Sequence, residues 1–594
     1  MANVTHQRNI MVRLTDRVHL ATDLYLPGGS PGPWPAIVER TPYDKLGAEL
    51  VLTAKYLAGH GYAVILQDVR GRYASEGEWY PFGNEGPDGV ETVGWVRAQP
   101  WCDGRVGTMG LSYSSCTQTS LAAMNPPGLS AQFVSQGFHN YHTASMRQGG
   151  ALEVRFLFYA FSMARTSKEA YADPVARSSL ERAWTDVRAW LKHAPPKAGL
   201  TPLRHVPSSE RWLLDIWQHG EYDAYWRTRP AYSIEDLWDQ HADVPIYLCG
   251  SWYDSYARST VTNYVELSRR KKNPVRLIMG PWTHGDIDRS YAGDADFGPD
   301  APLGYNYFLL RWFDAVLKDA PNGMLDGAPV QIFVMGGGSG RKLRGSEKLD
   351  VGGHWRDERE WPLARTRHTA YYLQPGGGLS PVAPPAGSTP TRYAFDPRDP
   401  VPTVGGNISA GFGVFVGGGF DQRGGPDADS PNARLPLSTR RDVLVFSTPP
   451  LEHAVEVTGT VVATLWASSS APDTDFTVKL IDVYPPNDDY PDGYELNIGD
   501  SIIRARYRNS FEAPELMEPG RVYPFTITLY PTSVAFQPRH QIRVHISSSN
   551  FPRFDINPNT GGPLGLERVF HTAVQTIFHD ADHPSHVLLP VIPS

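Results

Sequence analysis

The chain has 594 residues, of which 41% are hydrophobic and 20% are charged, a balance typical of a globular protein with two or three domains. Its 63 acidic residues outnumber the 55 basic ones, and the net charge of -8 argues against nucleic acid or an anionic membrane as the main partner. The three cysteines, Cys102, Cys116 and Cys249, include no CxxC pair, which excludes a disulfide framework and a zinc site.

The N-terminal residues show no apolar core of signal-peptide length, and no apolar run approaches the roughly 20 residues that span a bilayer. We therefore expect a cytoplasmic protein with no membrane partner. The sequence contains no glycine-rich phosphate loop in a dinucleotide context and no cluster of metal ligands, so neither a cofactor nor a metal is expected. The acidic run at residues 286–288 is interpreted as a solvated loop. The oligomeric state is left open, a homo-oligomer included.

The first third of the chain alternates strand and helix signals. Helices are predicted at 50–58 and 89–98, between short apolar runs. Such runs separated by helices indicate a parallel sheet with helices on its faces. The predicted strands cover residues 35–39, 62–66, 104–110, 244–249 and 274–279.

The segment from 145 to 238 lies between the third and fourth of these strands and is rich in Trp, Arg and Ala. Its helical character is clearest where apolar side chains share one face, namely Leu180, Trp184, Val187, Trp190 and Leu191. We interpret the segment as a helical cap inserted into the α/β domain. A separate domain distant from any site is the alternative.

Beyond about residue 350 the sequence is richer in Gly and Pro, and apolar residues alternate with polar ones. The alternation is clearest at 476–480, 525–529 and 542–546. Many short strands with a period of two predict a β-sandwich or jelly roll. The predicted organisation is a discontinuous α/β domain at 1–144 and 239–350, a helical cap at 145–238 and a jelly-roll domain at 351–594.

The strongest local signal is the run from Gly107 to Ser115, where a strand gives way to a helix predicted at 117–124. A serine hydroxyl needs a neighbouring base to act as a nucleophile. A tight strand–turn–helix elbow exposes that hydroxyl and aims the next backbone N–H at a developing oxyanion. Small residues are favoured two positions before and after the serine. Ser112 meets this demand through Gly110 and Ser114, whereas Ser114 and Ser115 are rival nucleophiles on composition alone.

Candidates for the other two members of a triad follow the fourth and fifth strands. Asp254 comes just after the strand at 244–249, and His284 comes just after the strand at 274–279. A triad on this fold requires the chain order Ser, Asp, His, with the acid and the base past the carboxyl ends of strands. The order and the positions together favour Asp254 as the acid that orients the base and His284 as the general base.

With these motifs the sequence resembles the cocaine-esterase-like (CocE/NonD) hydrolases, which are relatives of the X-prolyl dipeptidyl peptidases and the α-amino-acid ester hydrolases. The resemblance covers nearly the whole chain. It implies an α/β-hydrolase domain, an inserted helical domain and a C-terminal jelly roll, with Ser112, Asp254 and His284 as the triad. The motifs that carry it include Arg40–Lys45, Gln67–Arg72, Gln99–Val106, Gly110–Tyr113, Trp252–Asp254, Gly280–His284, Ala471–Phe476 and Ser547–Asp555.

The resemblance also implies an oxyanion hole made by the backbone N–H of Tyr113 and the phenolic hydroxyl of Tyr43. A neutral phenol donates a strong hydrogen bond without bringing a charge. Without the resemblance, Tyr43 is better explained as an aromatic residue packed at a strand end. The chain departs from the family at Ser115, where glycine is usual, and we expect tighter packing of the elbow helix there.

No acidic pair follows Asp254, since the next residues are Ser255, Tyr256, Ala257 and Arg258. In the related α-amino-acid ester hydrolases a Glu-Asp pair at this place binds a substrate ammonium group, so the resemblance disfavours a substrate with an α-ammonium group here. Tyr256 and Phe138 are predicted to form an apolar wall around the acyl group, and packing roles explain them equally well. The predicted function is hydrolysis of a small-molecule aryl or alkyl ester through an acyl-enzyme. An amidase, acylase or X-Pro-type peptidase is the runner-up, and a catalytically silent binding protein is the remaining alternative.

Overall fold

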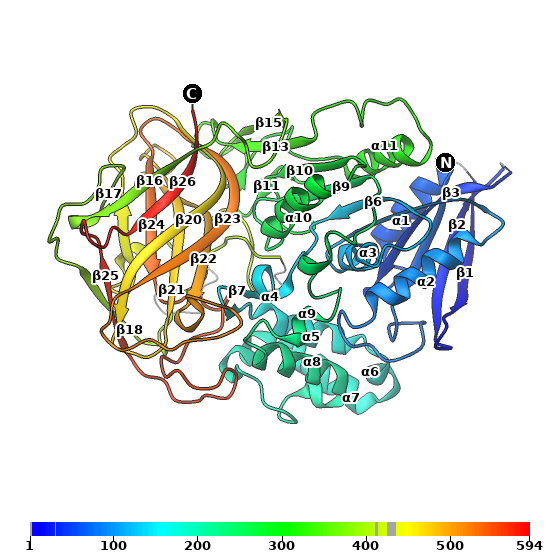
Figure 1. Cartoon of the computed structure of the whole chain (residues 1–594), viewed down its shortest axis with the longest axis horizontal. Coiled ribbons are helices and arrows are strands. Elements are labelled where there is room, and N and C mark those ends of the chain that lie inside the picture. The colour runs from blue at the N-terminus through cyan, green and yellow to red at the C-terminus, as the bar shows by residue number, and fades with distance from the viewer. Residues whose placement is uncertain (1–2, 30, 410–413, 425–434, 594) are drawn as a thin grey trace.

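A computed structural model of the chain describes residues 3–29, 31–409, 414–424 and 435–593. Figure 1 shows three parts in contact. The α/β domain runs from blue through green, the helical cap lies beneath its centre in teal, and the C-terminal β domain, in yellow to red, stands beside them. No helix of the described residues is both long and apolar enough to cross a membrane.

The α/β domain is organised around a mixed sheet with the strand order β1-β2-β4-β3-β5-β6-β9-β10-β13-β15. The pairings from β4 through β13 are parallel, and those at the two ends are antiparallel. All five predicted strands are present, as β3, β4, β5, β9 and β10. The strands are β1 (Val4–Arg13), β2 (His19–Pro27), β3 (Trp34–Thr41), β4 (Ala63–Asp68), β5 (Cys102–Leu111), β6 (Leu129–Ser135), β9 (Ile246–Ser251), β10 (Val275–Gly280), β13 (Val330–Met335) and β15 (Gly353–Glu358).

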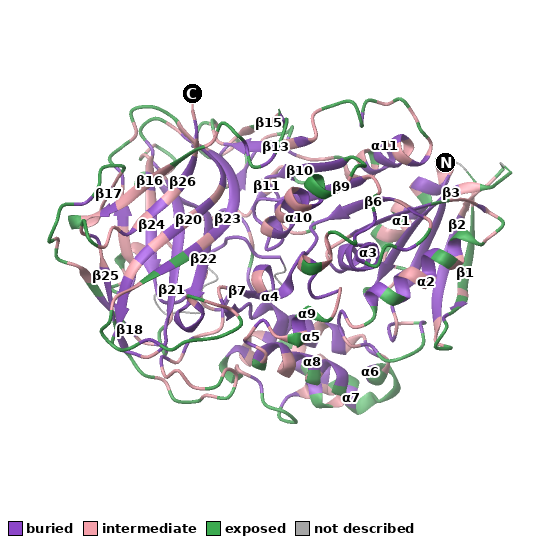
Figure 2. Ribbon diagram, viewed as in Figure 1, coloured by how far each residue is buried: buried purple, intermediate pink, exposed green. Residues whose placement is uncertain are grey.

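Helices cover both faces of this sheet because successive strand residues point to opposite sides. On β3, Ile37 packs in the cluster that contains α1 and α11, while Ala36 and Val38 pack in the cluster that contains α2 and α3. The inner strands β3, β4, β9 and β10 are accordingly buried, whereas the edge strand β1 is largely exposed, and exposed residues gather on the outer sides of the helices (Figure 2). The helices are α1 (Ala48–Gly59), α2 (Glu85–Arg97), α3 (Tyr113–Ala123), α10 (Ala257–Arg270) and α11 (Tyr305–Leu317).

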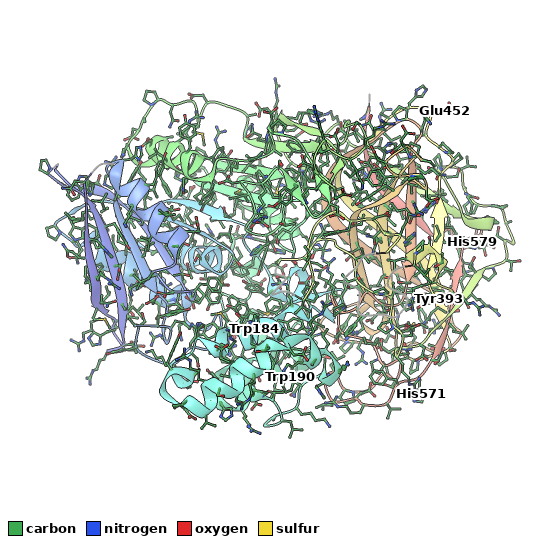
Figure 3. The ribbon with its side chains drawn as sticks, turned by 180° about the vertical axis from the view of Figure 1, so that it is seen from behind. Trp184, Trp190, Tyr393, Glu452, His571 and His579 are labelled. Carbon is green, nitrogen blue, oxygen red and sulfur yellow. The ribbon has the colours of Figure 1, made fainter. Side chains whose placement is uncertain are left out.

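The cap leaves the sheet after β6 and returns to it at β9. The amphipathic segment around 180–191 is interrupted, because Asp186 adopts φ -129° and ψ 59° and separates α7 from a 3₁₀ helix at Val187–His193. Trp184 and Trp190 thus come from different elements (Figure 3), and both pack against the cap core. The cap elements are α4 (Tyr141–Ala144), β7 (Arg147–Gln148), β8 (Ala151–Leu152), α5 (Arg155–Arg165), α6 (Lys168–Ala172), α7 (Pro174–Thr185), α8 (Pro207–Gln218) and α9 (Ala224–Arg227).

The C-terminal domain consists of two layers of mostly antiparallel strands with an apolar interior. One layer contains β16, β18, β20, β23, β25 and β26, and the other contains β17, β19, β21, β22 and β24. Phe476 and Phe525 meet between the layers with ring centroids 4.8 Å apart. The strands are β16 (Arg367–Gln374), β17 (Gly378–Ser380), β18 (Thr391–Phe395), β19 (Leu444–Ser447), β20 (Val455–Ser469), β21 (Asp475–Tyr484), β22 (Tyr494–Arg504), β23 (Tyr523–Phe536), β24 (Gln541–Ser547), β25 (Ala573–Phe578) and β26 (His586–Ile592).

The strands predicted around 476–480, 525–529 and 542–546 are therefore present, as β21, β23 and β24. The predicted fold class is confirmed: the chain combines an α/β-hydrolase domain, an inserted helical cap and a C-terminal β domain.

The cap contacts the C-terminal domain through the turn between β7 and β8. The backbone N–H of Arg504 donates to the Gly149 carbonyl at 2.7 Å. Gly149 has φ +52°, and a Cβ atom there would clash with the carbonyl oxygen of Ile502. The turn therefore needs glycine for two reasons, its backbone conformation and its close approach to β22.

We predict that Gly149→Ala lowers the thermal midpoint by loosening this contact, because overpacking typically costs about 1–3 kcal/mol beyond the backbone strain. Gly199→Ala is the matched control, since Gly199 also lies in the cap with φ +72°, and a Cβ atom added there would have no neighbour within 4 Å. Thermal unfolding of both variants measures the difference. Equal losses would show that backbone conformation alone, and not the contact with β22, sets the cost.

Candidate active site

Ser112 lies at the turn between β5 and α3, with φ 63° and ψ -117°. A non-glycine residue rarely adopts this conformation without a functional reason. Gly110 also has a positive φ, 141°, and a Cβ there would clash with the Cβ of Ser114. The predicted elbow is therefore present, with Gly110 required by its close approach. Tyr113 is the first residue of α3, so its N–H has no partner within the helix.

The side chain of Tyr113 is anchored in a buried polar network. Its Oη donates to Oε1 of Glu85 at 2.7 Å and accepts from the backbone N–H of Phe82 at 2.8 Å. Burial raises the pKa of the Tyr113 phenol well above its usual value, which keeps it a donor. Arg40 forms an ion pair with Glu85 at 3.5 Å. The network holds Tyr113, the residue that follows Ser112, in place. No sequence pattern indicated Glu85.

The predicted acid and base meet across the ends of β9 and β10. His284 Nδ1 lies 3.1 Å from Oδ1 of Asp254, which is fully buried. A carboxylate at Nδ1 favours the tautomer in which Nδ1 carries the proton and Nε2 is free to accept one. His284 and Ser112 line the same cavity.

Asp254 is held from the C-terminal side of the chain by residues that no sequence pattern singled out. Ser409 Oγ donates to Asp254 Oδ1 at 3.0 Å, and the Ser409 N–H donates to Ser255 Oγ at 3.1 Å. The side-chain amide of Asn407 donates to the carbonyl of Trp252. These three hydrogen bonds hold the loop that carries Asp254 in place.

The cavity above Ser112 has a volume of about 240 Å³ and walls that are mostly aromatic. Its lining residues are Tyr43, Phe82, Leu111, Ser112, Tyr113, Tyr141, Arg155, Phe156, Tyr159, Tyr256, His284 and Ser409. They come from the α/β domain, from the cap and from the segment between β18 and β19 of the C-terminal domain. Tyr141, Arg155, Phe156 and Tyr159 belong to cap helices and were not among the predicted site residues.

Tyr43 extends into this cavity from the loop after β3. Burial raises the pKa of its phenol to about 12, partly offset by the hydroxyl groups of Tyr159 and Ser112 beside it. The tyrosine is 41% exposed overall, so it borders solvent as well as the cavity. Tyr43 is therefore a neutral hydrogen-bond donor next to Ser112.

The two predicted wall residues differ in position. Tyr256 lines the cavity, and its ring centroid is 5.4 Å from that of His284. Phe138 is fully buried and stacks on Tyr141 at 4.7 Å, so it supports a lining residue from behind. Arg258 is directed elsewhere, since it donates to the carbonyls of Thr143 and Thr528.

Ser115, the departure from the family pattern, donates from Oγ to the Ser112 carbonyl at 2.5 Å. In the acidic run, Asp286 accepts from Thr283 Oγ1 and pairs with Arg289, and Asp288 accepts from the N–H of Tyr305. Within the part of the chain that the structure describes, no group of three or more His, Cys, Asp or Glu side chains is placed to hold a metal ion.

The chain is similar to known proteins over nearly its whole length. Residues 16–286 match the family described as X-Pro dipeptidyl-peptidase (S15 family), and residues 322–588 match the X-Pro dipeptidyl-peptidase C-terminal non-catalytic domain. The chain is 34% identical to cocaine esterase from Rhodococcus sp. (strain MB1 Bresler), over 99% of both chains. The chain belongs to the S15 family, among its cocaine-esterase-like members. It is therefore a serine hydrolase.

Two solved structures are similar over nearly the full length. An aminopeptidase from a marine sediment archaeon, Thaumarchaeota archaeon, superposes with a TM-score of 0.81 at 25% identity, covering 100% of this chain and 97% of that one. An α-amino acid ester hydrolase superposes with a TM-score of 0.77 at 25% identity, covering 99% of this chain and 97% of that one. The likeness extends over all three parts of the molecule.

A buried carboxyl group lies beneath the elbow. Glu39 on β3 is 6% exposed. Burial raises its pKa to about 7, and a hydrogen bond with the Ser114 hydroxyl offsets only part of the effect of burial. Because the folded-state pKa lies above the unfolded value near 4.5, the group's contribution to stability is fully present below pH 4.5. That contribution is lost as the pH rises through about 7.

We predict that Glu39→Gln stabilises the protein at pH 8 by up to about 3 kcal/mol and has little effect at pH 4.5, because the amide cannot ionise. Thermal midpoints of the variant and the wild type from pH 4.5 to 8 measure the difference. Glu49→Gln, at an exposed position of α1, is the control and should show no such trend. A constant offset between Glu39→Gln and the wild type across this range would refute a raised pKa at Glu39.

Proposed function

We propose that this hydrolase cleaves carboxylic esters with Ser112 as nucleophile, His284 as general base and Asp254 as the acid that orients the histidine. The observation that carries the proposal is the contact of 3.1 Å between His284 and Asp254 at the cavity that also contains Ser112. The positive φ of Ser112 supports its role, since the strained elbow exposes the hydroxyl. The relationship to cocaine esterase supports an ester as the substrate.

In this mechanism Ser112 Oγ attacks the ester carbonyl while His284 Nε2 takes its proton. Asp254 stabilises the imidazolium that forms, and the Tyr113 N–H and the Tyr43 hydroxyl donate to the oxyanion. His284 then returns the proton to the departing alkoxide or phenoxide, which leaves an acyl-enzyme. A water molecule deprotonated by His284 releases the carboxylic acid and restores Ser112.

The cavity favours an ester over a substrate with a free α-ammonium group. Its described lining residues are mostly Tyr and Phe, and none is a carboxylate that would pair with an ammonium ion. We propose Tyr256 as a wall of the acyl pocket and Phe138 as the residue that supports Tyr141 within it. The substrate in this proposal is a small molecule, in keeping with the volume of about 240 Å³.

For the rest of the molecule we propose the domain division predicted from the sequence: 1–144 with 239–350, 145–238, and 351–594. β15, at 353–358, falls in the third unit by residue number but pairs with β13 in the sheet of the first unit. We propose jelly-roll connectivity for the C-terminal domain on the basis of its two layers of strands. We propose the cytoplasm as the location, which is supported by three buried cysteines that form no disulfide.

We predict that a fluorophosphonate reagent labels the wild type once, at Ser112, and that Ser112→Ala loses both the label and ester turnover while keeping its thermal midpoint. The substitution deletes a hydroxyl and introduces nothing larger. Mass spectrometry of the labelled peptide identifies the site. Ser115→Ala is the control and should still be labelled at Ser112. Retention of more than a few per cent of kcat in Ser112→Ala would place the nucleophile elsewhere.

We predict that Tyr43→Phe lowers kcat about 10²–10³-fold with little change in KM, because one oxyanion donor is removed and the oxyanion is absent from the bound ester. Steady-state kinetics on one aryl ester, with a thermal midpoint, separates this loss from unfolding. Tyr307→Phe, a tyrosine 63% exposed on α11, is the control. A near-normal kcat for Tyr43→Phe would mean that another group donates, and lost activity with a much lower midpoint would indicate a packing role.

A further inference from the structure

The cavity above Ser112 contains a buried cation that the proposed mechanism does not use. Arg155 is the first residue of α5 and is 5% exposed, and it is the only Lys or Arg side chain among the described lining residues. Burying a guanidinium is costly unless its charge and its N–H groups are satisfied. The hydrogen bonds of Arg155 therefore show which of its N–H groups bind other residues of the protein and which are available to bind a ligand.

Two of the three nitrogen atoms of Arg155 are used by the protein. Its Nε donates to Oε2 of Glu153, and its Nη2 donates to Oγ of Ser145 at 2.7 Å. Nη1 forms no hydrogen bond of ordinary distance and angle with any residue the structure describes. Burial lowers the pKa of Arg155, but the charge of Glu153 and, after it, the Tyr256 phenol beside the guanidinium raise that pKa overall. One edge of the guanidinium thus remains for a group in the cavity.

The partner carboxylate does not neutralise Arg155 alone. Glu153 is 1% exposed and also lies 3.6 Å from Nη2 of Arg553, whose Nη1 pairs with Asp500, so the two arginines and the two carboxylates form one buried network. It further accepts a hydrogen bond from the side-chain amide of Gln148. Glu153 lies outside the lining of the cavity, and no described lining residue is a carboxylate. Arg155 is therefore the charged lining residue that a carboxylate in the cavity would meet.

Another buried arginine of the cap shows how a purely structural guanidinium is satisfied. Arg147 donates to the backbone carbonyls of Gly150, Ile216 and Trp217, and it does not line the cavity. Arg155 instead lies between aromatic faces, with its guanidinium carbon 4.0 Å from the Phe156 ring centroid and 5.6 Å from that of Tyr256. Aromatic faces hold a planar guanidinium in place and leave its edge open to a carboxylate.

We propose that Arg155 is the specificity-determining residue of the acyl pocket and binds a carboxylate carried by the acyl group. The substrate class is then a monoester of a dicarboxylic acid, with its free carboxylate on Arg155 and its ester carbonyl at Ser112. The volume of about 240 Å³ lies below the range of drug-sized pockets, which favours a short or single-ring acyl group. This inference rests on the proposed esterase function.

The test compares phenyl esters of 3-carboxybenzoic and 4-carboxybenzoic acid with phenyl 4-methylbenzoate, which has a similar size and no charge. We expect the wild type to favour at least one carboxybenzoate over the methyl compound about tenfold or more in kcat/KM. Arg155→Gln should lower kcat/KM for that carboxybenzoate about 10–100-fold, the range for a hydrogen bond to a charged group, and change the methyl substrate by less than about threefold. Arg155→Lys should keep part of the preference.

Arg165→Gln, at the other end of α5 and paired with Glu181, is the matched control and should leave the ratio unchanged. A wild type that shows no preference for either carboxybenzoate would overturn the proposal, whatever the variants do. Equal losses on charged and neutral esters in Arg155→Gln would also overturn it and assign Arg155 a structural role. Labelling of Ser112 by fluorophosphonate, with turnover of phenyl 4-methylbenzoate, shows in the same experiment that the esterase function stands even where this inference fails.

Discussion

The backbone of Ser112 is held at a positive φ, and the rest of the site is arranged around that strain. A non-glycine residue in this region costs about 1–3 kcal/mol, and it persists only where its surroundings determine it fully. Hydrogen bonds on both sides supply that determination: the Ser112 N–H donates to the Ser135 carbonyl, and the Ser112 carbonyl accepts from the N–H groups of Ser115 and Cys116. The serine is thus fixed between β6 and the first turn of α3.

Two short chains of interacting polar side chains lie around the elbow. Tyr113, Glu85 and Arg40 form one such chain, and Asp254, His284 and Ser409 form another. In a low-dielectric interior each of these groups is expensive when unpaired and strongly oriented when paired. Because an unpaired polar group is so costly there, a substitution that removes one partner is expected to be destabilising. For the same reason the paired groups have fixed positions before any substrate binds.

The elements of the α/β sheet that carry Ser112, Asp254 and His284 were predictable because each is a buried apolar run followed by its functional residue. β1 was not, since most residues of this edge strand are exposed, and the turn at Asp186 was not, because the apolar face continues across it. Tyr43 came only from the family resemblance. Arg155, Ser409 and Glu85 were beyond sequence reasoning, because nothing local to them shows that folding brings them to Ser112 or its neighbours.

The hydrogen bond from Ser409 to Asp254 spans 155 residues of the chain, and it enters the site from the region that matches a domain described as non-catalytic. On the ribosome, the sheet from β1 to β10 emerges long before Ser409 does. Asp254 therefore lacks this donor until the chain has been synthesised as far as residue 409. Contacts of such long sequence separation form slowly. A nascent chain truncated before this segment has the proposed nucleophile and base but lacks the hydrogen bond from Ser409 to the proposed acid, so we expect the site to be completed late in biosynthesis.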